Sequence, residues 1–289
     1  MILENEDLFV ELKLTGAELT RIYSKTTKLE YLWEGDSEYW NRQSPVLFPI
    51  VGGLKDKKYV VDGVEYELSQ HGFARDGKFK IIEQAADFVI LELQDSEESL
   101  KVYPFKFSLQ ITYSIDKNKI SVGYKVINKD SKEILFSIGG HPGFRCPLVN
   151  GSSFEDYYFE FPEDEKPIQT FINIEVGLRK EKTSQVDLGK KISLKYDLFE
   201  NDALIYEGLK STEVSLLSSK HPHGLKFRFT NFNYLAFWTK GKDAPFICIE
   251  PWCGIADSEE GQNEFSEKLG VEKLAMDEVF DTEYSMELF

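Results

Sequence analysis

The sequence predicts an all-β protein, built as a large antiparallel β-sandwich. Apolar and polar residues alternate with a period of two along most of the chain, and no segment sustains the 3.6-residue period of an amphipathic helix. Hydrophobic residues make up 42% of the 289 residues and aromatic residues 14%, which is ample apolar volume for one large core. No linker, repeat or low-complexity stretch divides the chain, so we expect a single domain over residues 1–289.

The strands expected in the first half follow from this alternation. Residues 8–14 alternate, and residues 58–68 form two strands around an Asp-Gly hairpin signal. Residues 79–93 have the pattern of a second strand pair. Residues 105–140 contain three strands, separated by the polar turns "DKNK" and "NKDSK". These segments predict antiparallel meanders, because short polar turns join consecutive strands.

The second half continues the pattern. Strands are expected in residues 191–199, 213–219, 225–239, 246–252 and 283–289. Residues 258–276 are the one stretch expected to be partly helical, and residues 146–153 are the most loop-like.

Charge and cysteine content exclude several classes of function. The net charge of −16 opposes binding to nucleic acid or anionic membranes, since both depend on Lys and Arg. The N-terminal segment has no signal-peptide pattern, and no stretch approaches the ~20 apolar residues of a membrane span. Cys146, Cys248 and Cys253 are an odd number, which fits free thiols in a reducing compartment. We therefore expect a cytoplasmic protein.

Two histidines occur in similar settings and indicate a site. His71 follows a predicted strand in "SQHGFARDG", and His141 follows another in "GGHPGFRC". The adjacent glycines permit unusual backbone angles or the close approach of a ligand. Each histidine alone is also compatible with an ordinary loop residue, but the repeated pattern favours a shared role. Histidine is the side chain whose proton moves most easily near neutral pH.

Three further polar residues interrupt apolar, aromatic stretches. Glu250 ends the apolar strand "FICIEPW", where partial desolvation would raise its pKa and make it a stronger base when ionised. Arg42 lies between Trp40 and the apolar run 46–51, and Asp202 lies in "LFENDALIY". Taken singly, Glu250 is also compatible with an exposed strand end, Arg42 with a surface ion pair and Asp202 with a turn.

Three other sequence features suggest metal or phosphate sites, but a structural interpretation fits each of them better. "HPHG", residues 221–224, fits a hairpin turn better than a metal site because of its Pro and Gly. Cys248 and Cys253 have no second cysteine pair and no histidine nearby in the sequence, which argues against zinc. The glycines of "IVGG" and "IGGHPG" lack the strand, loop and helix context of a phosphate-binding loop.

Four motifs, taken together, resemble a known family. "NRQSPVLFPIVGG", "HGFARD", "GGHPGF" and "IEPWCGIADS", in this order and spacing, resemble the aldose 1-epimerase (galactose mutarotase-like) family, and specifically its LacX-like branch. The resemblance spans nearly the whole chain. It implies the mutarotase supersandwich fold, and an enzyme that interconverts the α and β anomers of free aldoses without a cofactor or metal.

The resemblance also implies roles for individual residues. The family's catalytic base corresponds to Glu250 and its general acid to His141. Sugar-binding groups correspond to His71, Arg42 and Asp202. Trp40, Phe73 and Trp252 are the aromatic residues expected to pack on the sugar.

Several alternatives stay open at this stage. The surroundings of both histidines differ from those in the best-characterised galactose mutarotases, which leaves the preferred sugar open. A branch of the family acts on hexose 6-phosphates and needs a basic pocket, for which the candidates are Arg75, Lys55, Lys57 and Lys58. A noncatalytic sugar-binding or sugar-sensing protein is a rival, and a glycoside hydrolase with two carboxylates is another. The oligomeric state is open as well, a homodimer included.

Overall fold

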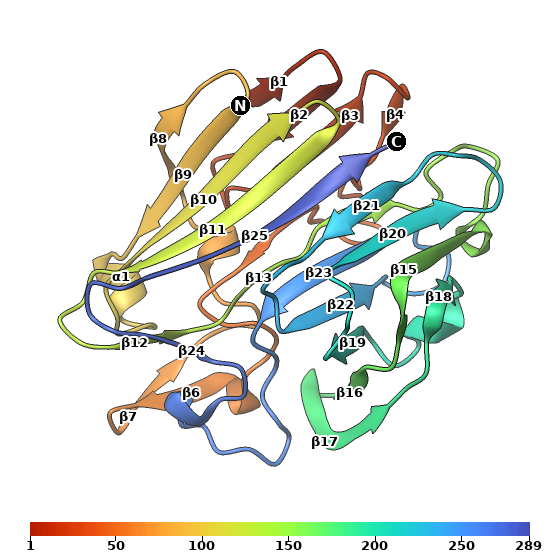
Figure 1. Cartoon of the computed structure of the whole chain (residues 1–289). Coiled ribbons are helices and arrows are strands. Elements are labelled where there is room, and N and C mark those ends of the chain that lie inside the picture. The colour runs from red at the N-terminus through yellow and green to blue at the C-terminus, as the bar shows by residue number, and fades with distance from the viewer.

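The computed structural model describes residues 1–289 and confirms the predicted fold class. Two large sheets, of nine and eight strands, dominate the molecule (Figure 1), and all pairs within them are antiparallel. Helical structure is confined to α1 (Glu97–Leu100) and five short 3-10 turns. No helix is both long and apolar enough to cross a membrane.

The nine-stranded sheet runs the length of the molecule. Its strands, in spatial order, are β18 (Gly189–Ser193), β15 (Tyr157–Glu165), β20 (Glu213–Ser218), β21 (Leu225–Arg228), β25 (Val279–Leu288), β11 (Lys119–Asn128), β10 (Phe107–Asp116), β9 (Phe88–Gln94) and β8 (Lys80–Gln84). The long hairpin of β10 and β11 buries alternate residues, as the period of two predicts. One face of this sheet therefore supplies much of the core.

The eight-stranded sheet carries the chemistry described below. Its path is β17 (Leu178–Gln185), β16 (Ile168–Asn173), β19 (Leu204–Glu207), β22 (Tyr234–Trp238), β23 (Phe246–Cys253), β13 (Ile138–Gly140) and β5 (Val46–Leu47), and β14 (Gly143–Arg145) also pairs with β23. All eight residues of β23 are buried. A strand covered on both faces is expected to be almost continuously apolar, and Glu250 is the exception.

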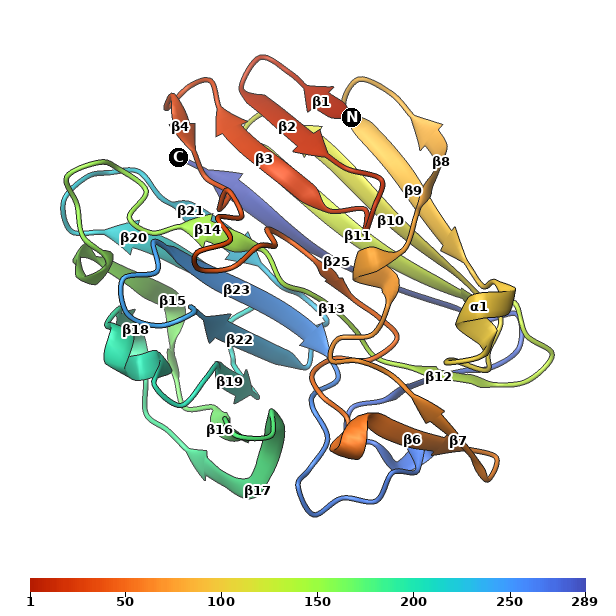
Figure 2. The ribbon, with the colours of Figure 1, turned by 180° about the vertical axis from the view of Figure 1, so that it is seen from behind.

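Three smaller sheets complete the structure. They are the four-stranded sheet β1 (Ile2–Glu4), β2 (Leu8–Leu12), β3 (Leu19–Ser24) and β4 (Leu29–Glu30), and the pairs β6 (Lys58–Val61) with β7 (Val64–Glu67) and β12 (Ile134–Phe136) with β24 (Glu272–Leu274). The four-stranded sheet lies over β9 to β11, as the view from behind shows (Figure 2). The hydroxyl of Tyr113 on β10 donates to the carbonyl of Ala17 across this interface.

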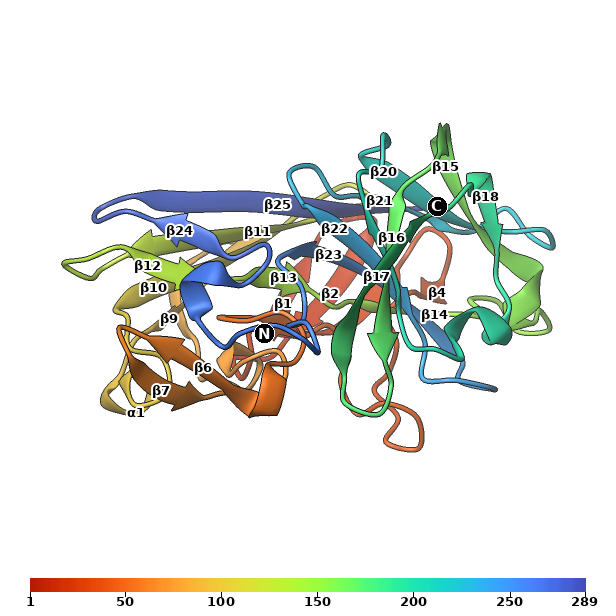
Figure 3. The same cartoon turned by 90° about the horizontal axis from the view of Figure 1, so that it is seen from below.

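The eight-stranded sheet covers the other half of the long sheet. Phe159 of β15 stacks on Phe237 of β22 with ring centroids 4.0 Å apart, and Phe144 meets Phe227 edge to face. The view from below separates these two layers (Figure 3). One cluster of 62 buried residues extends through both halves. We propose on this basis that residues 1–289 form one folding unit.

The structure confirms some of the turns and strands predicted from the sequence and contradicts other predictions. The hairpin of β6 and β7 is confirmed, with φ of +51° at Asp62 and +75° at Gly63, as a tight hairpin turn requires. "HPHG" is confirmed as the connection between β20 and β21. The partly helical segment 258–276 was wrong: it contains a 3-10 turn at Phe265–Glu267 and strand β24. Strands β15 to β17 were not predicted.

Candidate active site

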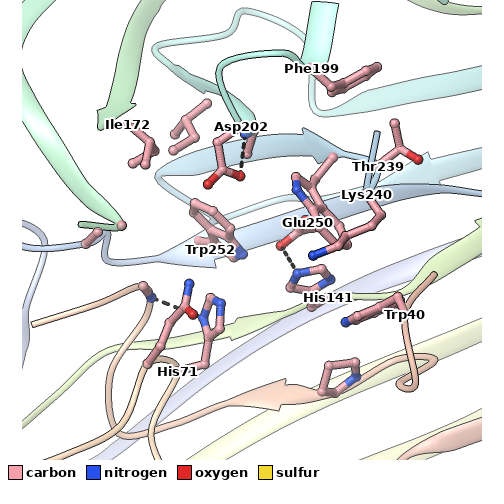
Figure 4. Close-up of a pocket in the computed structure, with 18 of the residues that line it drawn as sticks. Trp40, His71, His141, Ile172, Phe199, Asp202, Thr239, Lys240, Glu250 and Trp252 are labelled. Atoms are coloured by element: carbon pink, nitrogen blue, oxygen red, sulfur yellow. Dashed lines mark hydrogen bonds and ion pairs between the residues drawn. The ribbon is translucent and has the colours of Figure 1, made fainter. Parts of the chain in front are cut away.

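A pocket of about 460 Å³ opens beside β23, and it brings together residues from distant parts of the chain (Figure 4). Eight of the residues singled out from the sequence line it: Trp40, Arg42, His71, Arg75, His141, Asp202, Glu250 and Trp252. The size suits a small polar ligand.

Glu250 lies on β23 and reaches the pocket because of the strand's register. It pairs with Ala236 of β22, while Trp252, two residues further on, shares its face of the sheet. The residue is 1% exposed, and neither carboxylate oxygen accepts a hydrogen bond. Burial raises the pKa of Glu250 well above its usual value, and the Asp202 carboxylate adds to the rise.

His141 approaches Glu250 from β13, and two glycines make this approach possible. A Cβ on Gly139 would lie 2.6 Å from Cδ1 of Trp252, and one on Gly140 would lie 2.9 Å from the Tyr124 hydroxyl. His141 Nε2 is 3.1 Å from Glu250 Oε2, an ion-pair contact without hydrogen-bond alignment. Burial lowers the pKa of His141 to about 3.

Burial favours the uncharged forms of both groups, a protonated carboxyl on Glu250 and a neutral imidazole on His141. That state contains the same number of protons as a carboxylate beside an imidazolium. A pair of this kind can accept a proton at one atom and supply one at another.

His71 lies beside His141, with ring centroids 5.8 Å apart. Its backbone has φ of +66°, and a Cβ on the following Gly72 would lie 2.3 Å from the Phe48 carbonyl oxygen. The backbone N–H of Gly52 donates to Nδ1 of His71 at 3.1 Å. Since burial lowers the pKa of His71 well below its usual value, the ring is neutral and its Nε2 carries the hydrogen. His71 is therefore a donor.

Aromatic rings hold the imidazole of His141 in place. Trp40 lies 4.8 Å from the ring of His141, and Trp238 meets the same ring edge to face at 5.6 Å. The indole N–H of Trp252, also at the pocket, is close enough to Glu250 to lower the pKa of its carboxyl, but it has no partner with hydrogen-bond geometry. The expectation for Phe73 was wrong, because its ring packs against Phe48 in the core and is not part of the pocket lining.

Three cationic side chains reach the pocket. Arg42 contacts both carboxylate oxygens of Asp76, at 2.9 and 3.3 Å. Arg75 donates to the Gln70 carbonyl at 2.7 Å, while its buried Nε has no hydrogen-bond partner. Lys240, in the loop after β22, was missed because nothing distinguishes it from the neighbouring polar residues of "TKGKD".

The other basic candidates were wrong. Lys55, Lys57 and Lys58 do not line the pocket. Lys55 Nζ donates to the Gly261 carbonyl and Lys58 pairs with Glu65 at 2.7 Å, so both are held away from it.

Asp202 lies in the turn before β19, where its backbone has φ of +75°. Its Oδ1 accepts the N–H of Ala203 at 2.8 Å, and burial raises its pKa. The wall around it is apolar and was not predicted; it consists of Ile172, Ile174, Phe199, Ala203 and Ile205. These residues come from β16, β19 and their turns, where ordinary core and turn sequences give no signal of a ligand.

Folding places Cys248 close to two of the predicted site residues. It lies two residues before Glu250 on the same face of β23, and its Sγ, a ring nitrogen of His141 and a carboxylate oxygen of Glu250 all lie within 4.8 Å of one another. The sequence has no histidine close to Cys248, but folding supplies one from β13.

The chain matches the family model for aldose 1-epimerase over residues 1–263. It is 36% identical to the plasmid-encoded protein LacX of Lactococcus lactis subsp. lactis, over 94% of this chain and 93% of the relative. A galactose mutarotase related enzyme from Lactobacillus acidophilus superposes with a TM-score of 0.96 at 33% identity, over 100% of this chain and 97% of the other.

A galactose mutarotase-like protein from Lactobacillus casei superposes with a TM-score of 0.93 at 31% identity, over 100% and 99% of the two chains. The family model spans most of the chain, and the LacX relative exceeds a third identity over nearly its full length. The chain belongs to the aldose 1-epimerase family.

Proposed function

We propose that this protein is an aldose 1-epimerase that interconverts the α and β anomers of a free aldohexose, with Glu250 as base and His141 as acid. The observation that supports this most directly is the buried, unpartnered carboxylate of Glu250, 3.1 Å from the His141 imidazole at a pocket of sugar size. Membership of the aldose 1-epimerase family points to the same reaction.

The reaction needs one proton removed and one supplied. The hydroxyl on C1 loses its proton to Glu250 while the ring oxygen gains one from His141, and the bond between C1 and the ring oxygen breaks. The pair passes from carboxylate and imidazolium to carboxyl and neutral imidazole, so its single proton is conserved. Rotation about the C1 to C2 bond then presents the other face of the aldehyde, and the reverse transfers close the ring.

The neutral form favoured in the empty pocket is the state reached after ring opening. Hydroxyl groups of the bound sugar would solvate the charged form and make it accessible before the reaction. General acid or base assistance contributes roughly 10²–10⁴-fold. In this proposal the sugar also separates the two side chains, which are in contact in its absence.

The remaining residues at the pocket would orient the sugar. His71 offers its Nε2 hydrogen, and Arg42 and Asp202 offer charged groups to ring hydroxyls. Trp252 combines an apolar face with an unpartnered N–H. Trp40 adds a second aromatic surface beside His141.

Hexose 6-phosphates are a second candidate substrate class, and one observation favours them. The chain has a net charge of −16, yet Arg42, Arg75 and Lys240 gather at this pocket. Lys240 forms no ion pair, and the buried Nε of Arg75 has no hydrogen-bond partner, although Oδ2 of Asp76 lies 3.9 Å from it. A phosphate group would complement these cations.

A panel of freshly dissolved sugars tests both candidates. The approach of α-glucose, α-galactose and α-glucose 6-phosphate to their equilibrium anomer ratios is followed by polarimetry or anomer-resolved NMR, with and without the protein. We expect acceleration of at least one free aldose. Tight binding of a sugar without acceleration of any aldose would instead identify a sugar-binding protein.

A further inference from the structure

Cys248 is a buried nucleophilic group that the proposed mechanism does not use. It is 0% exposed and lies behind Glu250, on the same face of β23. The Glu250 carboxylate adds to the rise in the pKa of Cys248 that burial causes, which fits the proximity of the two groups. The thiol, the His141 imidazole and the Glu250 carboxylate each present one ligand atom within 4.8 Å of the other two.

These groups have hydrogen-bonding capacity that the fold leaves unfilled. Both oxygens of Glu250 and Nδ1 of His141 are buried without a hydrogen-bond partner. Such groups are few in native structures, and each is costly in a low-dielectric interior. A cation placed among them would satisfy the carboxylate directly.

Thiolate, imidazole and carboxylate are the ligand types that zinc prefers. Two ligand atoms on a tetrahedral zinc lie about 3.3–3.8 Å apart, given bonds of about 2.0–2.3 Å. The 3.1 Å between His141 Nε2 and Glu250 Oε2 is already close to that separation, and the sulfur has to move closer by up to about 1.3 Å.

We propose that Cys248, His141 and Glu250 form an inhibitory site for a thiophilic divalent cation such as Zn²⁺. On binding, the thiol proton and the proton shared by the acid and base pair leave to solvent, and the cation replaces their two positive charges. The net charge of the buried cluster is therefore unchanged, which avoids an uncompensated charge in the interior. The thiolate selects against Mg²⁺ and Ca²⁺, which prefer oxygen ligands.

The proposal makes two claims, that the cation binds and that it inhibits. The claim of inhibition rests on the proposed function of Glu250 and His141. A cation bound to Glu250 and His141 occupies both groups that move protons, so ring opening stops even though the pocket remains open. Binding itself does not depend on the reaction. The two claims are therefore separable by experiment.

The binding test uses Co²⁺ alone, added to the metal-free protein and followed by absorbance. A tetrahedral Co²⁺ with a thiolate ligand gives intense visible bands and a sulfur-to-cobalt charge-transfer band. We expect one equivalent to produce both, and we expect Cys248→Ser to remove the charge-transfer band and weaken binding by at least 10–100-fold, the typical cost of losing even an outer-shell partner. Cys248→Ala serves the same purpose if the serine variant folds poorly.

Cys253 provides the matched control. It is equally buried on the same strand, but its Sγ contacts the Asn231 carbonyl and lies on the opposite face from Cys248. Cys253→Ser should keep the cobalt spectrum and the basal rate. A wild-type protein without the charge-transfer band, or a band that survives Cys248→Ser, would overturn the proposal.

The inhibition test adds Zn²⁺ to the mutarotation assay. We expect Zn²⁺ to suppress wild-type turnover and EDTA to restore it, while Cys248→Ser turns over at its own metal-free rate in the same Zn²⁺ concentration. Equal sensitivity of both proteins would place the inhibitory cation elsewhere and contradict the proposal. A protein that shows the cobalt spectrum but no mutarotation would leave the site intact and remove the proposed function instead.

Discussion

Two buried glutamates in this molecule differ in what surrounds their carboxylates. Glu165, at the end of β15, is 0% exposed, and its two oxygens accept the backbone N–H groups of Lys210 and Ser211 at 2.9 and 2.8 Å. Glu250 is 1% exposed, and neither of its oxygens accepts a hydrogen bond. The two carboxylates are equally buried, but only that of Glu165 accepts hydrogen bonds from backbone N–H groups.

The difference separates a structural carboxylate from one available for chemistry. At Glu165 the fold supplies one backbone donor to each oxygen, so the carboxylate fixes a turn. At Glu250 no backbone N–H is directed at the carboxylate, its pKa is raised, and its hydrogen-bonding capacity remains available to a bound molecule. Matched substitutions at the two sites should therefore affect different properties.

The largest expected effect is on turnover in Glu250→Gln. The amide keeps the shape of the side chain but cannot accept the proton, so we expect kcat to fall by roughly 10²–10⁴-fold with a much smaller change in sugar affinity. The rate at which α-galactose reaches its equilibrium anomer ratio measures kcat. Quenching of tryptophan fluorescence measures the sugar affinity. Unchanged turnover would remove Glu250 from the mechanism.

His141→Asn should reduce kcat to a similar extent, because acid and base act in the same step. The double variant with Glu250→Gln should then be much less impaired than the product of the two single losses. The same anomer assay measures all three proteins. Losses that multiply would mean that the two residues act in separate steps.

Glu165→Gln should affect stability and leave turnover unchanged. In wild type each Glu165 oxygen accepts a backbone N–H. In the variant the amide NH₂ replaces one of these oxygens, so one backbone N–H loses its acceptor. Loss of a hydrogen bond to a charged group costs about 1.5–3 kcal/mol of stability. Urea denaturation measures the free energy of unfolding. A loss of turnover without loss of stability would contradict the comparison with Glu250.

The smallest expected effects concern His221 and His223, the two histidines of the β20 to β21 turn. The sequence predicts the same structural role for both. Nε2 of His221 lies 2.7 Å from the Tyr157 hydroxyl, which also accepts the N–H of Leu148, whereas no hydrogen bond holds the ring of His223. His221→Ala should cost about 0.5–1.5 kcal/mol of stability, the typical contribution of one hydrogen bond, and His223→Ala less. Neither should slow turnover by more than a few-fold, as the anomer assay can check.

The long strands were predictable because their alternation reflects local geometry. β10 and β11 each bury every second residue, and a one-residue slip would expose the whole buried set. Segment 258–276 was mistaken for partly helical because its many Glu, Lys, Leu and Ala residues favour helices. Tertiary contacts override that preference: buried Lys268 donates to the Ile255 carbonyl and to Asp257, which holds the segment against β23.

The candidate site was predictable in part. Glu250 and His141 were identifiable because a carboxylate in an apolar strand and a histidine after two glycines are unusual locally. Lys240 and Ile174 were not, since an exposed lysine and a turn isoleucine are ordinary in sequence and reach the pocket through the path of the chain. The proximity of Cys248 to His141 depends on the approach of β13 to β23, which no local pattern encodes.

The position of β25 has a consequence for synthesis on the ribosome. This strand is the latest in the sequence, yet it lies in the middle of the nine-stranded sheet, between β21 and β11. The two halves of that sheet emerge with open edges and cannot be joined until β25 leaves the exit tunnel. Until β25 is available, the strands β21 and β11 have open edges, and such edges are prone to aggregation.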